Sequence, residues 1–106
     1  MIDWTRIVGF DWDAGNARKS SEKHGVGQAE AEQAFFNQPL LILADPRHSR
    51  RETRFHALGI TDEKRQLHIS FTLRRRPAES FLIRVISARD MHRKERQRYA
   101  QAEKNS

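Results

Sequence analysis

The sequence predicts an α+β domain, in which an antiparallel sheet carries two N-terminal helices on one face and is followed by a charged C-terminal helix. Residues 67–73 alternate between apolar and polar side chains, which is typical of a strand with one buried face. Residues 13–36 instead carry capping residues and spaced alanines, which are typical of helices. The length of 106 residues, with 37% hydrophobic and 32% charged residues, predicts one domain over residues 1–106 with a thin core.

The N-terminal part is expected to form one short strand and two helices. Residues 8–12 predict the strand, and Asp13 is placed to cap the following helix, because its carboxylate accepts hydrogen bonds from the first free amides. This helix is expected to end at about His24, since Gly25 readily takes the left-handed conformation that closes many helices. A second helix is expected over residues 27–36, where small alanines favour close packing on the sheet.

The remaining elements are expected to be four strands and a final helix. The strands cover residues 40–44, 53–60, 67–73 and 81–88, with a hairpin connection at 61–64 and a basic turn at 74–79. A charged helix is expected from about Asp90 to Ala102. The order β-α-α-β-β-β-β-α, with short connections between strands, predicts an antiparallel meander whose second face is partly open.

The positive charge of the chain lies in its second half. The net charge is +6, and residues 74–98 hold nine Lys and Arg against three Asp and Glu. A polyanion such as RNA or DNA is the natural partner of such a surface. The alternative is a solvated basic face that keeps the protein soluble.

Several classes of protein are disfavoured by what the sequence lacks. The chain has no cysteine, which excludes disulfides and thiolate metal sites. The first residues do not resemble a signal peptide, and the longest apolar run, Leu40–Ala44, is far shorter than the ~20 residues that span a bilayer. We therefore expect a soluble, cytoplasmic protein without a membrane segment.

Metal or serine catalysis is not indicated by any motif. The acids do not cluster as ligand sets, no H-E-x-x-H spacing occurs, and no serine stands in a nucleophile elbow. We therefore expect no cofactor. The chemistry that remains acts without a metal on a substrate that supplies its own nucleophile, as RNA does through its 2′-hydroxyl.

The open face of the predicted sheet holds the candidate site. Four polar residues of one strand share a side at period two, namely His68, Ser70, Thr72 and Arg74. Arg84 points into the same cleft if the neighbouring strand lies in register. Its charge then needs a partner, because an unpaired buried charge costs several kcal/mol; a salt bridge to an acid such as Glu52 and an open site for a phosphate are both consistent with the pattern.

Four blocks of the sequence together resemble one family. They are FDWDAGNARKSSEKHGV (10–26), DPRHSRRETR (45–54), RVISARD (84–90) and KERQRYA (94–100). In this order they resemble the BrnT ribonuclease toxins of bacterial type II toxin–antitoxin pairs, over most of the chain. The resemblance implies a RelE-like fold, cleavage of RNA without a metal, and a small DNA-binding antitoxin, BrnA-like, which neutralises the toxin and represses the operon with it. On this resemblance, the toxin would contact DNA only indirectly, through its complex with the antitoxin.

The resemblance also implies which residues form the site. Motif matches and the basic strands give the catalytic candidates Lys23, His24, Thr72, Arg74 and Arg84. The candidates for substrate binding are Arg54, Ser87 and Arg89, together with Arg93 and Arg96 of the final helix. The alternatives are structural roles: Lys23 is a cation at a helix C-terminus, which the helix dipole favours, and His24 is a packing residue. No role is assigned to His56, His68 or His92.

The leading hypothesis is a metal-independent endoribonuclease toxin that cleaves RNA by attack of the substrate 2′-hydroxyl and so inhibits translation and growth. Cations from two neighbouring strands and the end of the first helix are expected to converge on the scissile phosphate, with His24 as general base or acid. The final helix either follows the RNA backbone or is held by an acidic antitoxin segment. The alternative function is a basic module that binds nucleic acid or antitoxin without catalysis; a DNA-binding repressor is disfavoured, because the sequence contains no helix-turn-helix signal.

Overall fold

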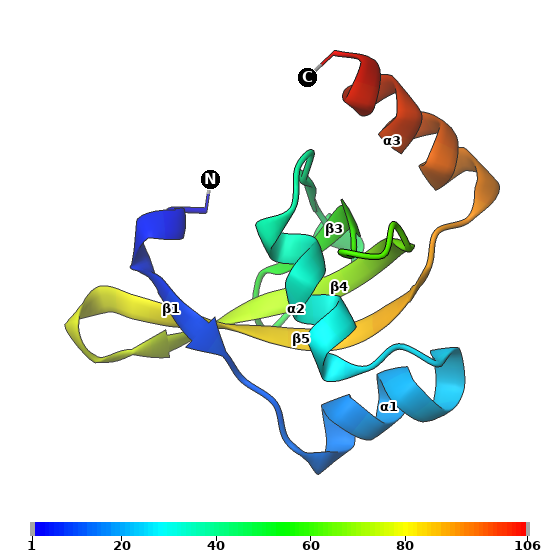
Figure 1. Ribbon diagram of the computed structural model, residues 1–106. Helices are drawn as coiled ribbons and strands as arrows, with labels where there is room; N and C mark the ends of the chain where they lie inside the picture. The colour runs from blue at the N-terminus through cyan, green and yellow to red at the C-terminus, as the bar shows by residue number, and fades with distance from the viewer. Residues whose placement is uncertain (1, 106) are drawn as a thin grey trace.

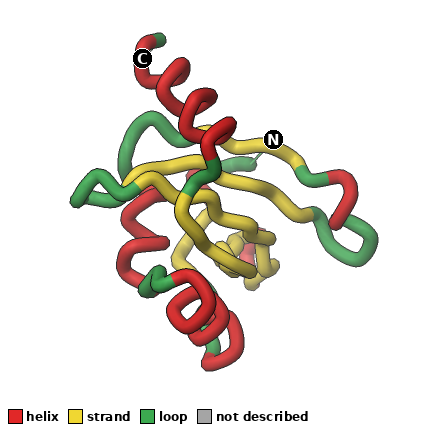
Figure 2. The backbone as a smooth tube through the Cα atoms, turned by 90° about the vertical axis from the view of Figure 1, so that its right-hand side faces the viewer, coloured by secondary structure: helices red, strands yellow, loops and turns green. Residues whose placement is uncertain are grey.

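The computed structural model describes residues 2–105 and confirms the α+β class. The helices are α1 (Ala14–His24), α2 (Gln28–Phe36) and α3 (Arg93–Lys104). The strands are β1 (Ile7–Phe10), β2 (Leu41–Ala44), β3 (Arg54–Ile60), β4 (Gln66–Arg76) and β5 (Ser80–Asp90). Short 3₁₀ turns lie at Trp4–Arg6, Pro46–His48 and Pro77–Glu79. In Figures 1 and 2, α1 and α2 lie against the strands, whereas α3 projects from the body of the molecule.

The sheet is mixed, and the expectation of a purely antiparallel sheet is therefore wrong. Its strand order is β1-β5-β4-β3-β2, in which β2 to β5 form the expected antiparallel meander. The first strand instead pairs parallel with β5. This orientation is possible because α1 and α2 separate β1 from β2 along the chain, so that no tight hairpin constrains the direction of β1.

The alternating pattern of β4 sorts its side chains between two environments. Ile69 and Phe71 are fully buried and pack with Val85 of β5 in the main core, which α2 covers. The helix approaches β3 closely at Gly59, where an added Cβ would lie 2.7 Å from the carbonyl oxygen of Ala34. Glycine is therefore required at this contact for steric reasons.

The first helix completes the edge of β5 beyond the end of β1. Asn16 donates from Nδ2 to the carbonyl of Val85, and Ser20 accepts from the amide of Ala88. Asp13 caps α1 as predicted, accepting from the amide of Asn16, and Gly25 closes it in the left-handed region with φ 66°. Polar side chains of a helix thus satisfy backbone groups that a further strand would otherwise pair.

Two boundaries differ from the prediction because of strand pairing. Residues 74–76, expected in a turn, continue β4 and pair with residues 80–82 of β5, so the turn is confined to Pro77–Glu79. Similarly, Asp90 pairs with Leu67 and belongs to β5, and α3 begins only at Arg93. Alternation and charge alone do not reveal such pairing between strands.

The final helix covers part of the second face of the sheet. Tyr99 is fully buried and packs with Leu58 and Met91, and its hydroxyl donates to the carbonyl of Pro39 at 2.7 Å. A second, smaller core therefore lies beneath α3. Within residues 2–105, no helix combines the length and apolar character needed to cross a membrane.

Candidate functional site

Three rows of side chains cross the face of the sheet opposite α2. The register of β3, β4 and β5 gives the rows Arg54–Thr72–Arg84, His56–Ser70–Ser87 and Leu58–His68–Arg89. Directly opposed residues of antiparallel strands carry their side chains on one face. The expectation that Arg84 shares a face with Thr72 is thus confirmed.

The second and third rows form the floor of a cavity of about 570 Å³. The sheet contributes Leu43, His56, Leu58, His68, Ser70, Ser87 and Arg89, and α3 contributes Lys94, Glu95 and Arg98. Two of the predicted binding residues, Ser87 and Arg89, therefore line the cavity. It brings together histidines, hydroxyls and cations, which are groups that transfer protons and bind anions.

Two histidines lie side by side in this cavity, with ring centroids 4.7 Å apart. The His56 ring is held at both nitrogens, with Nε2 2.8 Å from Oδ2 of Asp45 and Nδ1 3.2 Å from Oγ of Ser70. Burial, assisted by the charge of Arg89, lowers the pKa of His68 to about 4, so its ring is neutral at physiological pH. Its Nδ1 is buried and has no hydrogen-bond partner among residues 2–105.

Arg89 makes a two-pronged ion pair across the cavity. Its Nη1 and Nη2 lie 2.8 and 3.0 Å from the two carboxylate oxygens of Glu95, and Nη1 also donates to the carbonyl of Asp90. Burial raises the pKa of Glu95, but the hydrogen bonds from Arg89 and from the amide of His92 outweigh it and lower the pKa to about 2. Arg89 donates three hydrogen bonds, two to Glu95 and one to the carbonyl of Asp90, out of the five that a guanidinium can donate. It therefore retains donors for a phosphate oxygen.

The two arginines expected to stabilise the transition state are both paired with carboxylates. Arg84 lies 3.3 Å from Asp11 and 2.9 Å from Asp13, and Arg74 lies 3.1 Å from Glu52. Arg84 therefore forms a salt bridge, but with Asp11 and Asp13 rather than Glu52. Its hydrogen bond to Asp13 raises the pKa of Arg84 further.

The expected convergence of Lys23 and His24 with Arg74 and Arg84 is wrong. Asp13, which binds Arg84, caps the start of α1, whereas Lys23 and His24 end this 11-residue helix. At 1.5 Å per residue the two ends are about 15 Å apart. The difference arises because α1 runs along the edge of β5 and carries its last turn to the Asp90 end of that strand.

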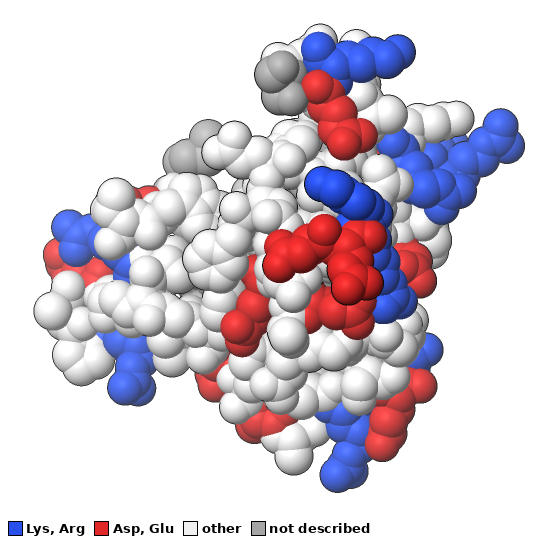
Figure 3. Space-filling view, viewed as in Figure 1, with Lys and Arg blue, Asp and Glu red and all other residues white. Residues whose placement is uncertain are grey.

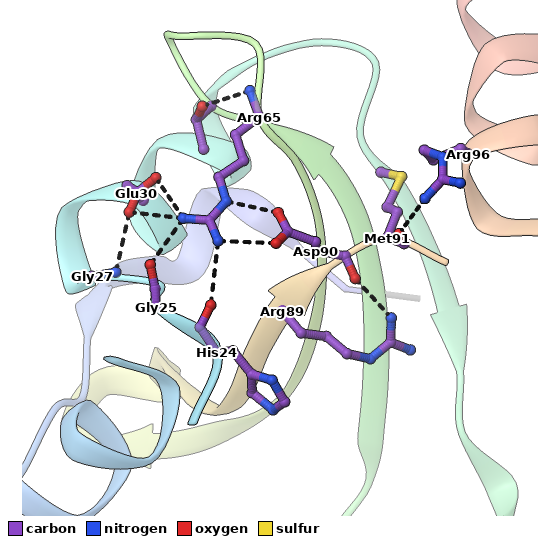
Figure 4. A network of polar contacts seen from close by, with 10 residues as sticks. His24, Gly25, Gly27, Glu30, Arg65, Arg89, Asp90, Met91 and Arg96 are labelled. Atoms are coloured by element: carbon purple, nitrogen blue, oxygen red, sulfur yellow. Dashed lines mark hydrogen bonds and ion pairs between the residues drawn. The ribbon is translucent and has the colours of Figure 1, made fainter. Parts of the chain in front are cut away.

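Arg65 binds the backbone where the chain turns after His24. Its guanidinium donates to the carbonyls of His24 and Gly25, to Asp90 at 2.7 and 3.1 Å, and to Glu30 at 3.1 and 3.3 Å. Figure 4 shows this group at the centre of the network, between α1, α2 and β5. The free carbonyls at the end of α1 are thereby satisfied, which gives this segment a structural function. In the same view the side chain of Arg89 extends away from His24.

The cations of α3 that line the cavity are not the ones predicted. Lys94 and Arg98, four residues apart on one helix face, line it. Arg96 instead donates to the carbonyl of Met91 at 2.7 Å, and Arg93 is exposed outside the cavity lining. The contribution of the final helix to the cavity therefore comes from neighbours of the predicted residues.

The side of the molecule on which α2 lies, opposite the cavity, does not present a continuous basic surface. Figure 3 shows the side on which α2 lies, where acidic side chains gather beside the helix and Lys and Arg are interspersed among them. A polyanion is therefore poorly matched to that side.

Sequence reasoning assigned no role to the cavity residues His56 and His68, and it missed Asp45, the buried partner of His56. The alternation of residues 54–60 and the hairpin at 61–65 contain the signal for the first two, because they set His56 opposite Ser70. Asp45 has no such signal, since it reaches His56 from the corner that follows β2.

Comparison with models of protein families identifies a family that the chain matches over most of its length. A family model described as "Ribonuclease toxin, BrnT, of type II toxin-antitoxin system" matches residues 12–95. No curated protein matches the chain. Within residues 2–105, no three His, Asp or Glu side chains are arranged to hold a metal ion.

Proposed function

The chain belongs to the BrnT family of ribonuclease toxins of type II toxin–antitoxin systems, and from this premise we propose that it is an endoribonuclease that cleaves RNA, without a metal, in the cavity between the sheet and α3. One observation supports the location above the others. His56, Ser70 and Arg89 line a single cavity whose other wall carries Lys94 and Arg98. Proton-transfer groups and phosphate-binding cations thus share one site.

Each group has a role in this proposal. His56 takes the proton of the substrate 2′-hydroxyl, whose oxygen forms a bond to phosphorus while the bond from phosphorus to the 5′-oxygen breaks. Lys94, on the opposite wall, gives a proton to the leaving 5′-oxygen, which suits in-line displacement. Arg89 and Arg98 stabilise charge on the non-bridging oxygens. The products are a 2′,3′-cyclic phosphate and a 5′-hydroxyl.

The other predicted residues have supporting roles in the proposal. Arg54, Arg74 and Arg84 lie on the same face beyond the cavity and guide the flanking RNA, while Arg93 and Arg96 do so from α3. Thr72 has no contact with RNA in this proposal, because its side chain is buried and its hydroxyl donates to the carbonyl of Thr53 at 2.7 Å. Catalysis by Lys23 or His24 stays a prediction, which His24→Ala and the response of both residues to bound RNA test below. The general base is assigned to His56 because His24 does not line the cavity.

The family implies an antitoxin partner. Within the proposal this antitoxin is BrnA-like, carries the DNA-binding domain of the complex, and meets the toxin in the cytoplasm, where both are made. The toxin then has no contact with DNA of its own.

We expect purified protein to cleave bulk RNA in excess EDTA and to leave ends that polynucleotide kinase labels directly, because a 5′-hydroxyl needs no prior dephosphorylation. A His56→Ala preparation purified in parallel controls for contaminating ribonuclease. Loss of cleavage in EDTA, or products with 5′-phosphate and 3′-hydroxyl ends, would contradict the mechanism. Intact RNA that binds in a salt-dependent manner would support the non-catalytic module instead.

A further inference from the structure

Three side chains from separate elements form a hydrogen-bonded line at the cavity. Asp45 follows β2, His56 lies on β3 and Ser70 on β4. The carboxylate Oδ2 of Asp45 is 2.8 Å from Nε2 of His56, whose Nδ1 is 3.2 Å from Oγ of Ser70. In an acid, an imidazole and a hydroxyl joined in this order, the acid holds the imidazole in one orientation and one tautomer.

Asp45 is held firmly at its end of the line. Its side chain is only 6% exposed, and Oδ2 also lies 2.9 Å from Nδ1 of His48. Its amide donates to the carbonyl of Arg54 at 2.9 Å. Burial raises the pKa of Asp45, but the hydrogen bond from His48 and the nearby histidines outweigh it, so the pKa is lowered and the group is a carboxylate at neutral pH.

The carboxylate defines which nitrogen of His56 accepts a proton. An anion beside Nε2 requires the hydrogen on that nitrogen, so the lone pair is on Nδ1. Nδ1 faces Ser70 on the cavity floor, where the substrate hydroxyl is proposed to arrive. The hydroxyl of Ser70 thus occupies the hydrogen-bond position that a 2′-hydroxyl would take.

We propose that Asp45 is a positioning residue for RNA cleavage, which fixes the tautomer of His56 and stabilises its protonated form, and that Ser70 keeps Nδ1 satisfied until the substrate 2′-hydroxyl replaces it. This inference rests on the proposed function. His48 helps to hold Asp45 in place, because Nδ1 of His48 contacts the same carboxylate oxygen, Oδ2, that Nε2 of His56 contacts.

The charged and titratable groups around His56 come from several elements. They are Asp45 and His48 at the corner after β2, His68 on β4, Arg89 on β5, and Lys94, Glu95 and Arg98 on α3. Among residues 2–105, Asp45 is the one acid whose carboxylate contacts the His56 ring, so its removal is the specific perturbation.

The test is Asp45→Asn, with the exposed loop variant Glu63→Gln as the matched control. We expect kcat for an RNA oligonucleotide to fall about 10²-fold or more with KM within about twofold, because binding cations are unchanged. The rising limb of the pH profile of kcat should move to lower pH, because the protonated ring has lost its stabilising anion. A fall in KM and kcat alike with an unmoved pH profile would contradict positioning.

Two further measurements separate the alternatives. Ser70→Ala should lower the rate of cleavage less than Asp45→Asn does, because Ser70 gives up its contact with Nδ1 when the substrate binds. A loss as large as that of Asp45→Asn would overturn the placeholder role. Long-range ¹H–¹⁵N NMR of the imidazoles should show the Nε2–H tautomer of His56, which is lost in Asp45→Asn. Because the tautomer is read without RNA, an unchanged tautomer would refute the positioning role even if the protein cleaves no RNA, whereas absence of cleavage by the unchanged protein would refute only the proposed function.

Discussion

Replacement of His56 by alanine is expected to lower the rate of RNA cleavage by about 10²–10⁴-fold, the usual contribution of a general base. The ring is partly exposed and its neighbours Asp45 and Ser70 are polar, so its loss should leave the core intact. Cleavage of an RNA oligonucleotide under single-turnover conditions measures the chemical step, and circular dichroism with urea unfolding checks the fold.

His24→Ala is the matched control for this variant. His24 ends α1, contacts the Arg65 network through its backbone carbonyl and lies outside the cavity lining. Removing its side chain should leave cleavage within about threefold of the unchanged protein, because the carbonyl remains. The opposite ranking, with His24→Ala inactive and His56→Ala active, would move the catalytic centre to the end of α1.

Replacement of Arg65 by alanine is expected to have the largest effect on stability, a loss of about 2–3 kcal/mol in the free energy of unfolding. The side chain is 28% exposed, which reduces the effect below that of a fully buried pair. Its removal leaves the carboxylates of Glu30 and Asp90 and two carbonyls at the end of α1 without this donor. Urea titration measures the change.

Arg76→Ala is the control, because Arg76 is exposed at the end of β4 and should cost less than about 0.5 kcal/mol. The effect of Arg65 should also depend on pH. Its hydrogen bonds lower the pKa of Asp90 below the ordinary 3.8, so the stabilisation is present at neutral pH and is lost as the pH falls through the folded-state pKa. Equal stabilities of the two variants at pH 7 would contradict the structural role of Arg65.

The sequence was sufficient for those parts of the fold that depend on local interactions. The cap at Asp13, the close of α1 at Gly25 and the strand over residues 67–73 each follow from neighbouring residues, and all are confirmed. The expectation that the polar face of this strand is partly open is wrong for His68, Ser70 and Thr72, which are buried as well. The parallel pairing of β1 with β5 and the extension of β4 to Arg76 depend on partners far along the chain. Propensity and charge contain little information about such contacts.

The same distinction applies to the candidate site. The alternation of side chains between the two faces of a strand correctly placed His68, Ser70, Thr72 and Arg74 on one face. The register of the hairpin adds His56 to this face. The pairing of Arg84 with Asp11 and Asp13 was not predictable, because α1 first has to fold along β5. Cations that look available in the sequence are therefore partly neutralised by tertiary contacts.

Imidazole and amide chemical shifts during titration with a 2′-O-methyl RNA oligonucleotide test most directly whether RNA binds in the cavity beneath α3. This ligand lacks the attacking hydroxyl and stays intact. We predict that the largest shifts fall on His56, His68 and Arg89, while His24 and Lys23 change little. Shifts confined to the end of α1, with His56 and His68 unmoved, would contradict the account.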